Sequence, residues 1–273
     1  MISCQLITFI DNGDLKSTCD FNADKIMAGE VIYEVLRVVE GVPLFLNEHL
    51  VRFQHSASMS HFQIPDSEFL KKGIRLLIET NGLKNGNIRL QTTSAPDQPN
   101  RWYCWVAPHY YPTKSQYAEG VRTGLFQAKR NHPNIKRWNG KLKQEEAEKL
   151  ATSGYYELLL TSDDKITEGS RSNVFFINEN ELFTAKVNSV LPGVTRAIVI
   201  QIIRALRFQL HETDIDVRDL PKFQSAFLTG TSPGILPIQS IDDYLLRVDH
   251  PLLQMLQVSY QQACEKALKN FVW

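Results

Sequence analysis

Residues 166–177, ITEGSRSNVFFI, place a short polar segment directly before an apolar run. Small residues flank Glu168 in the polar segment, so the backbone can turn tightly on both sides of this carboxylate. The apolar residues 174–177 predict a strand that enters a hydrophobic core. Because a buried carboxylate is costly without a positive partner, the segment predicts an acid that is paired with a cationic group.

The bulk composition places the chain among soluble proteins with a sizeable core. It has 273 residues, of which 43% are hydrophobic, enough for one large domain or two modest ones. Lys plus Arg and Asp plus Glu each total 30, so no excess charge attracts nucleic acid or an anionic membrane. The cysteines show no disulfide or zinc spacing, and no apolar stretch reaches the length of a membrane span. We therefore expect a cytoplasmic protein with neither a nucleic-acid nor a membrane partner.

The first part of the chain predicts a mixture of strands and helices. Apolar alternation and the turn residues Asn12-Gly13 and Glu40-Gly41 indicate a strand followed by a hairpin. Helical spacing of apolar residues then indicates two amphipathic helices, and two strands follow them across a turn-rich loop. The expected elements are the helices 48–59 and 67–80 and the strands 87–93 and 101–110.

The second part is richer in strand, turn and helix combinations. Residues 155–185 predict three strands, and residues 191–208 predict a loop that leads into a long amphipathic helix with Thr195 as its cap. A strand, a glycine-rich loop and a strand follow in residues 225–241, before a last helix that begins at Pro251. The expected organisation is a smaller N-terminal domain over 1–115, a linker over 116–130 and a larger C-terminal domain over 131–273.

Two loops have the composition of an anion site. Gly193 precedes a helix whose N–H groups and dipole would favour a phosphate, and Thr195 adds a hydroxyl group. Thr231 and Ser232 lie in a glycine-rich loop after an apolar strand, where backbone N–H groups can surround an oxyanion. Either loop taken alone fits an ordinary cap or turn better than an anion site.

A lysine is the remaining chemical candidate, because the histidines are scattered and no metal, Walker or nucleotide-binding motif is found. Lys136 lies in a basic stretch with Lys141 and Lys143, and the pattern alone also fits a solvated basic face. A desolvated lysine can form a Schiff base with a carbonyl group. An amine, an anion site and an acid together match the aldehyde, phosphate and pyridine nitrogen of pyridoxal 5'-phosphate (PLP).

Seven stretches in order resemble the fold-type IV PLP enzymes, also called class IV aminotransferases. This family includes branched-chain aminotransferase, D-amino acid aminotransferase and 4-amino-4-deoxychorismate lyase. The resemblance implies a two-domain α/β (α+β) fold, like that of D-amino acid aminotransferase, with PLP at the domain interface. The matching stretches are YEVLRVVEG (33–41), LNEHLVRF (46–53), NIKRWN (134–139), GYYELLL (154–160), TEGSRSNVFF (167–176), LPGVTR (191–196) and FLTGTSPGILPI (227–238).

The resemblance implies a role for each matched residue. Lys136 resembles the lysine that holds the cofactor through a Schiff base, and the family spacing fits it rather than Lys141 or Lys143. Glu168 resembles the acid that pairs with the pyridine nitrogen, which makes that nitrogen its cationic partner. Helical periodicity puts Arg52 on the solvent face, and only the resemblance makes it a phosphate ligand. The other implied phosphate contacts are Val194, Thr195 and Thr231.

The family resemblance leaves the reaction open between two classes. The sequence favours an aminotransferase that moves an amino group between an amino acid and a 2-oxo acid. The alternative is the lyase, which releases pyruvate from aminodeoxychorismate to give p-aminobenzoate. A remote alternative is a non-catalytic member that binds a ligand. The family also implies a small-molecule amino substrate and a homodimer.

The substrate site is the part where this sequence departs from the family patterns. Gly140 follows Asn139 where branched-chain enzymes carry a tyrosine nearby, and the stretch around Arg101 lacks the histidine of the Arg-x-His pair in D-amino acid aminotransferases. Arg171, inside the glutamate motif, is a candidate for binding the substrate carboxylate, although it also fits a surface arginine on a turn. The candidate substrate-binding residues are Tyr33, Arg101, Arg171 and Ser232.

Overall fold

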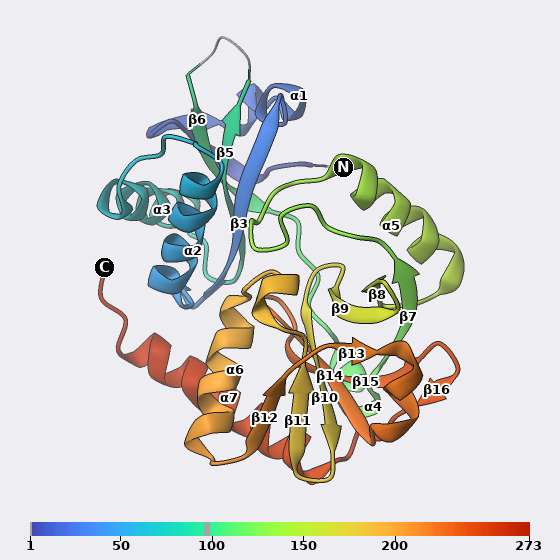
Figure 1. The fold of residues 1–273 in the computed structure, drawn as a ribbon. Helices are drawn as coiled ribbons and strands as arrows, with labels where there is room; N and C mark the ends of the chain where they lie inside the picture. Colours follow the sequence, from blue (N-terminus) through green and yellow to red (C-terminus); the bar gives the residue numbers. More distant parts are fainter. Residues whose placement is uncertain (1, 96–98) are drawn as a thin grey trace. The chain divides into compact units, whose positions relative to one another are not determined.

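The computed structural model describes residues 2–95 and 99–273, and the chain divides into two compact units (Figure 1). Residues 96–98, in the predicted loop between two strands, lie outside the described residues. Unit 1 comprises Met1–Tyr110, Ile135–Trp138 and Cys264–Trp273, and unit 2 comprises Tyr111–Asn134 and Asn139–Ala263. Each unit combines one β-sheet with helices, as the α/β prediction requires.

Unit 1 is built on a six-stranded antiparallel sheet with the strand order β2-β1-β6-β5-β3-β4. The predicted hairpin is confirmed, since β3 returns as β4 through Glu40 and Gly41, which both have positive φ angles. The two predicted helices are confirmed as α2 and α3, and Gly82 ends α3 in the left-handed conformation. The elements are β1 (Gln5–Asp11), β2 (Asp14–Ser17), α1 (Ala23–Ile26), β3 (Glu30–Val39), β4 (Val42–Pro43), α2 (Leu46–Met59), α3 (Ser67–Asn81), β5 (Gly86–Ser94) and β6 (Arg101–Ala107).

The two faces of this sheet have different coverings. In Figure 1, α2 and α3 lie together against one face, where Leu50, Phe53, Ile74 and Leu77 are buried in one apolar cluster. Burial of each such side chain contributes about 1.5–3 kcal/mol. A smaller aromatic cluster, which includes Trp105, covers part of the opposite face. Because side chains alternate along a strand, neighbouring residues of β3 point to these two different environments.

Residues 135–138 extend the sheet of unit 1 beyond β3. The Tyr33 N–H donates to the Lys136 carbonyl oxygen at 3.1 Å, and the Trp138 N–H donates to the Val31 carbonyl oxygen at 2.9 Å. Ile32 forms an antiparallel bridge with Arg137. The sequence predicted that this segment belongs to the C-terminal domain, whereas its backbone hydrogen bonds and its contacts place it in unit 1.

Unit 2 contains a ten-stranded mixed sheet with the order β12-β11-β10-β14-β15-β7-β8-β9-β13, and β16 pairs with β15. The predicted linker 116–130 differs from the structure, because most of it forms the end of α4 and the strand β7 within this sheet. The elements are α4 (Lys114–Glu119), β7 (Val121–Gln127), α5 (Gly140–Ser153), β8 (Glu157–Ser162), β9 (Lys165–Gly169), β10 (Asn173–Asn178), β11 (Glu181–Thr184), α6 (Val194–Ala205), β12 (Gln209–Glu212), β13 (Ile215–Asp216), β14 (Ser225–Gly230), β15 (Gly234–Ile241), β16 (Tyr244–Leu245) and α7 (Pro251–Lys269).

The central strands of this sheet are buried on both faces. Phe175 of β10 stacks on Phe227 of β14, with 5.1 Å between ring centroids, in a cluster that includes Val199 of α6 and Leu253 of α7. Phe176 points to the opposite face and a second apolar cluster. Two-sided burial accounts for continuous rather than alternating apolar runs. The predicted entry of residues 174–177 into a core is therefore confirmed.

The polar segment before β10 divides what the sequence predicted as one strand. Residues 155–185 form four strands rather than three, because Ser170, Arg171 and Ser172 separate β9 from β10. The Ser172 hydroxyl and the Arg171 N–H donate to Glu157 Oε1, at 2.8 and 2.7 Å. This carboxylate satisfies the turn locally and so fixes the end of β9, where Glu168 lies.

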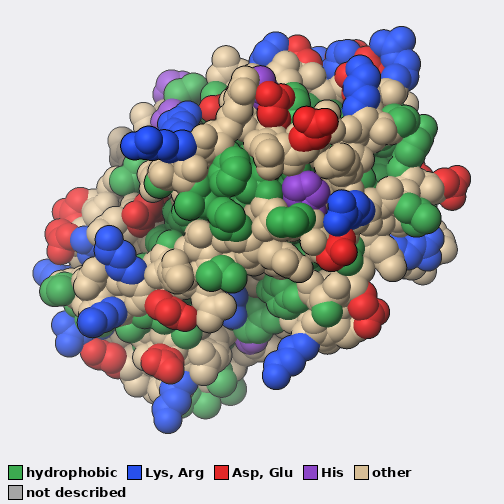
Figure 2. Space-filling view, turned by 90° about the horizontal axis from the view of Figure 1, so that it is seen from below, with side chains coloured by type: hydrophobic (Ala, Val, Ile, Leu, Met, Phe, Trp, Pro, Cys, Tyr) green, Lys and Arg blue, Asp and Glu red, His purple; other side chains and the backbone are tan. Residues whose placement is uncertain are grey.

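The face of the molecule shown in Figure 2 has a mixed charge, because Lys and Arg side chains are interspersed with Asp and Glu side chains over it. No helix within residues 2–95 and 99–273 is long and apolar enough to cross a bilayer.

Candidate functional site

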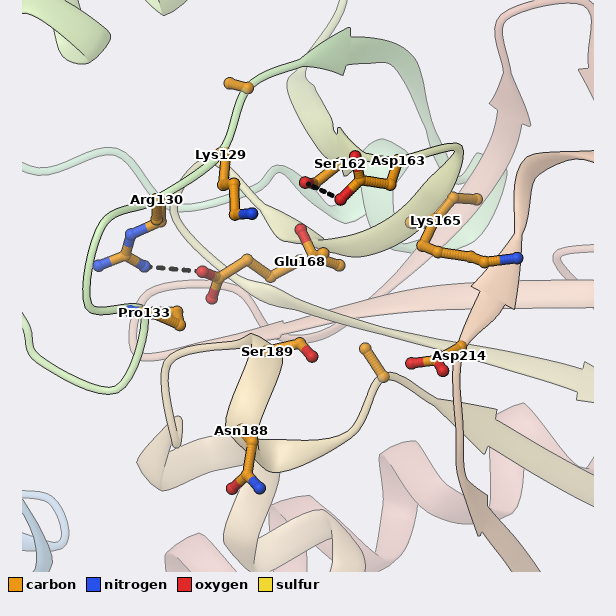
Figure 3. A pocket seen from close by; sticks show the side chains of 14 residues that line it. Lys129, Arg130, Pro133, Ser162, Asp163, Lys165, Glu168, Asn188, Ser189 and Asp214 are labelled. Carbon is orange, nitrogen blue, oxygen red and sulfur yellow. Dashed lines mark hydrogen bonds and ion pairs between the residues drawn. The ribbon is translucent and has the colours of Figure 1, made fainter.

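Glu168 is buried near the end of β9 and accepts hydrogen bonds on both carboxylate oxygens. Its side chain is 3% exposed, and Oε1 pairs with Nη1 of Arg130 at 2.8 Å (Figure 3). Oε2 accepts the Leu191 N–H at 2.9 Å and the Asn173 side-chain amide at 3.5 Å. The predicted cationic partner within unit 2 is thus an arginine, which offsets the cost of burying the charge. Arg130 was not among the site residues predicted from the sequence.

Asn173 connects the acid to the loop that precedes α6. Its amide Nδ2 donates to the Leu191 carbonyl oxygen at 2.9 Å as well as to Glu168. A Cβ atom on Gly193 would come within 2.2 Å of Asn173 Oδ1, so only glycine allows this close approach. The start of α6 therefore lies directly beside the residue that holds Glu168.

The start of α6 has no side-chain cap. Gly193 occupies the N-cap position, and Val194 and Thr195 are the first two helical residues, both buried. The prediction that Thr195 caps this helix is wrong, because the N-cap is Gly193, two residues earlier. The first N–H groups of a helix have no acceptor within the helix, and the dipole makes this end favourable for an anion.

The glycine-rich turn between β14 and β15 lies on the other side of Asn173. Asn173 pairs with Thr229 across β10 and β14, and Gly230 pairs with Gly234 to close the turn that carries Thr231 and Ser232. The hydroxyl of Thr229 is buried and has no hydrogen-bond partner among the described residues. Glu168, the α6 N-terminus and this turn are therefore brought together around one asparagine.

Lys136 lies in unit 1 and is held through its backbone. Its N–H donates to the Ser56 hydroxyl at 3.3 Å, while its carbonyl oxygen accepts from β3. Its Nζ lies 4.9 Å from the centroid of the Tyr33 ring. Lys141 is 89% exposed, and Lys143 donates to Glu146 at 2.7 Å. The environment of Lys136 thus differs from that of the two neighbouring lysines.

Arg52 is buried, in contrast to the solvent position that periodicity predicts. Its side chain is 8% exposed and forms a two-point pair with Glu34, from Nε to Oε1 and from Nη2 to Oε2, both at 2.7 Å. His49 Nδ1 lies 2.9 Å from Glu34 Oε2. The helix is buried on two sides, since His49, Arg52 and Ser56 form a polar stripe at helical spacing beside the apolar one.

The charges of this cluster are set by burial and by the arginine. Burial alone would raise the pKa of Glu34, but Arg52 and His49 outweigh it and lower the pKa to about 2. Burial lowers the pKa of His49, and Glu34 opposes that effect. The cluster therefore contains a carboxylate and a guanidinium at neutral pH, with a histidine whose neutral form is favoured.

Replacing Glu34 by Gln is expected to lower the thermal midpoint at neutral pH, because Arg52 remains buried without its anion. The folded-state pKa of about 2 lies below the usual 4.5, so the stabilisation is complete above pH 4.5 and is lost as the pH falls towards 2. A shift of this size corresponds to about 3 kcal/mol. The difference in midpoint between wild type and Glu34→Gln should shrink across this interval in calorimetric scans.

Glu30→Gln is the matched control, because Glu30 begins the same strand and pairs with Arg137 while remaining 58% exposed. An exposed pair contributes about 0–1 kcal/mol, so this variant should resemble wild type. If the difference in thermal midpoint between wild type and Glu34→Gln stays constant down to pH 2, the charge of Glu34 does not stabilise the fold.

The candidate substrate-binding residues lie in different units. In unit 1, Tyr33 lies next to Lys136, and Arg101 pairs with Asp11 at 2.7 Å. In unit 2, Arg171 is exposed and its guanidinium donates to the Tyr156 carbonyl oxygen at 2.7 Å. Arg101 and Arg171 therefore already have partners within their own units. Ser232 lies in the turn after β14.

A pocket of about 430 Å³ in unit 2 borders Glu168 and Arg130 (Figure 3). Its charged lining is mixed, since Lys129 and Lys165 accompany Arg130, while Asp163 and Asp214 accompany Glu168. The charged side chains that line this pocket are therefore balanced in number between cations and anions.

Comparisons with known proteins agree with this architecture. D-alanine aminotransferase from Bacillus licheniformis is 25% identical over 248 residues, which cover 86% of this chain and 88% of that protein. The structure of branched-chain aminotransferase from the archaeon Thermoproteus uzoniensis with norvaline has a TM-score of 0.84 at 22% identity, covering 96% of this chain and 96% of that one. 4-Amino-4-deoxychorismate lyase from Pseudomonas aeruginosa has a TM-score of 0.78 at 19% identity, covering 93% and 98%.

The fold is therefore that of the fold-type IV enzymes, and the predicted fold class is confirmed. The family model described as amino-transferase class IV matches residues 31–241, a span that contains β9, α6 and all of β3 except Glu30. With most of its length in this match, the chain belongs to the class IV aminotransferases.

Proposed function

We propose that this enzyme is a PLP-dependent aminotransferase that moves an amino group between an amino acid and a 2-oxo acid. Membership of the class IV family supports this reaction class, and the D-alanine aminotransferase relative aligns over most of both chains. The observation that carries the proposal is the cluster around Asn173, where a buried carboxylate lies beside an uncapped helix N-terminus.

The residues of the chain fit the three polar parts of PLP. The uncapped α6 N-terminus and the unpartnered Thr229 hydroxyl suit a phosphate group, and we assign this part to Val194, Thr195 and Thr231. Glu168 suits the protonated ring nitrogen. In unit 1, Arg52 adds a phosphate contact and Lys136 offers the amine that reacts with the aldehyde.

When bound, PLP supplies an electron sink for the bond that breaks at the substrate Cα. Lys136 would remove the substrate Cα proton as a base and, as an acid, would deliver a proton to the carbon of the former aldehyde group. The Glu168 carboxylate holds the proton on the ring nitrogen, and Arg130 together with the Leu191 N–H fixes the orientation of that carboxylate. These assignments of side chains remain predictions.

The decisive measurement is a half-reaction scan of the PLP-loaded protein with L- and D-amino acids. We expect one class to remove the visible absorbance of the loaded protein and a 2-oxo acid to restore it. Whether the L- or the D-amino acids react would identify the stereochemistry of the substrate. Absorbance that no amino acid changes would contradict the proposal.

Two alternatives are tested by the same preparation. Release of pyruvate and p-aminobenzoate from enzymatically generated aminodeoxychorismate would make the protein the lyase, whose fold it shares. A protein that takes up no PLP would be a non-catalytic binding member.

That the protein is a cytoplasmic homodimer also remains a prediction, and sedimentation measures its oligomeric state.

A further inference from the structure

Lys143 lies near the start of α5 and ties that helix to the turn that follows Glu168. Its Nζ donates to the Ser170 carbonyl oxygen at 2.6 Å and to Glu146 Oε2 at 2.7 Å. The helix and the turn both belong to unit 2, and the Asn139 side chain caps the helix. One ammonium group therefore joins two segments that are 27 residues apart in the chain.

The turn between β9 and β10 is held by two side chains of opposite charge. Glu157 of β8 accepts from the Arg171 N–H and from the Ser172 hydroxyl group. Lys143 makes the complementary contact, because it donates to a carbonyl oxygen, which a carboxylate cannot bind. The donors and an acceptor of this turn thus each have a charged partner from a neighbouring element.

The residue that Lys143 holds is close in the chain to the centre of the candidate site. Ser170 lies two residues after Glu168 and three before Asn173. Its N–H donates to the Leu158 carbonyl oxygen at 2.8 Å, while its own carbonyl oxygen accepts from Lys143. Ser170 is therefore fixed on both sides, and a shift there would move the backbone that carries the Glu168 carboxylate.

Stability alone does not account for the pair formed by Lys143 and Glu146. Glu146 is 4% exposed, and its Oε1 is buried without a hydrogen-bond partner among the described residues. Burial raises the pKa of Glu146, and Lys143 offsets only part of that rise. Apolar residues of similar volume in place of a buried ion pair are often neutral or stabilising. The pair therefore contributes more to the geometry of the turn than to the stability of the fold.

We propose that Lys143 is a positioning residue that sets the position of the Glu168 carboxylate by fixing the turn that follows it. The inference rests on the proposed aminotransferase function, in which Glu168 pairs with the ring nitrogen of PLP. Lys143 contacts neither substrate nor cofactor in this role and acts through the Ser170 carbonyl oxygen. Glu146 keeps the ammonium group directed at that oxygen.

Hydrogen exchange of the whole chain, with no PLP added, tests whether Lys143 holds the turn. Lys143→Met should speed exchange in the peptide that contains residues 168–173, because the turn loses one of its two charged partners. Lys141→Met is the matched control, since Lys141 lies on the same helix, is 89% exposed and pairs with Glu145 at 3.9 Å. Exchange in Lys143→Met that equals wild type would overturn the inference.

Single-turnover half-reactions test whether this contact matters for the reaction. A misplacement of about 1 Å can cost about 100-fold, so Lys143→Met should lower the rate by about 10- to 100-fold. The half-saturating amino acid concentration should stay unchanged, because Lys143 does not bind the substrate. A partly unfolded preparation lowers the amplitude of the absorbance change and not its rate constant. A wild-type rate together with faster exchange would show a purely structural contact and overturn the inference.

Combination with Glu168→Gln tests whether Lys143 acts through this carboxylate. If it does, adding Lys143→Met to Glu168→Gln should cause little further loss of rate. The visible absorbance maximum of PLP-loaded Lys143→Met should also shift in the direction seen for Glu168→Gln. Losses that multiply would place the effect of Lys143 elsewhere and overturn the inference. A wild type inert to every amine would instead refute the aminotransferase proposal, on which the role of Lys143 rests.

A second variant serves if Lys143→Met, which leaves Glu146 buried without its cation, does not fold. Lys143→Met combined with Glu146→Leu removes both charges, so the fold should survive while the contact with Ser170 is lost. Lys143→Arg keeps a cationic donor and should restore wild-type exchange and most of the rate. A loss of rate as large in Lys143→Arg as in the double variant would contradict a role for this charged hydrogen bond.

Discussion

Replacing Lys136 by Ala is expected to abolish turnover while leaving the protein folded. A positioned general acid–base contributes about 10²–10⁴-fold to a rate, and loss of the amine that reacts with the cofactor adds to that effect. The fold should survive because the backbone of Lys136, not its side chain, makes the bonds to Ser56 and to β3. Single-turnover absorbance measurements with the preferred amino acid give the rate, and calorimetry gives the thermal midpoint.

Lys141→Ala is the matched control for this experiment. Lys141 lies five residues away in the same basic stretch, is 89% exposed and forms a long ion pair with Glu145 at 3.9 Å. Its removal should change neither the rate nor the midpoint. Borohydride reduction of the PLP-loaded wild type, followed by peptide mass spectrometry, should locate the added mass on residue 136. Retained turnover in Lys136→Ala, or a label on another lysine, would move the reacting amine elsewhere.

The sequence correctly predicted those helices and strands that depend on residues close together in the chain. The hairpin at Glu40-Gly41, the helix α3 ended by Gly82, and the strand that carries Phe175 all follow from turn chemistry and apolar spacing. The strand β7 was missed because only the parallel neighbours β8 and β15 make it a strand. The segment around Lys136 was placed with the wrong part of the chain for the same reason, since its partner β3 lies about a hundred residues earlier.

The residues of the candidate site also divide into those that a local sequence pattern predicts and those that depend on distant partners. Glu168 and Lys136 stand out in short motifs, and the turn around Glu168 is visible from the sequence. The Arg130 partner is not, because a basic stretch carries no periodic signal that points to one acid. Arg52 was placed on the wrong face because one apolar stripe suggested one buried side, whereas Glu34 provides a second.

The contacts of Glu168 allow the effect of its negative charge to be separated from the effect of its packing. Arg130 lies on Oε1, and the Leu191 N–H lies on Oε2, so the carboxylate is oriented by groups from two separate segments. A glutamine has the same length and can keep one of these contacts, but its amide carries no negative charge. The arginine side chain is 23% exposed, so it can regain water when the anion is removed. The substitution therefore tests charge more than packing.

Glu168→Gln is expected to lower the single-turnover rate by about 10²–10³-fold, the usual effect of removing one preorganised electrostatic group. PLP should still bind after dialysis, because the phosphate and aldehyde contacts remain. Asp249→Asn is the control: Asp249 also pairs with an arginine of unit 2, Arg247 at 3.3 Å, yet it lies just before α7, outside the contacts of the Asn173 cluster. A near-normal rate in Glu168→Gln would show that Glu168 does not act through the ring nitrogen of PLP. Equal losses in both variants would instead point to stability, because a lost ion pair is all that they share.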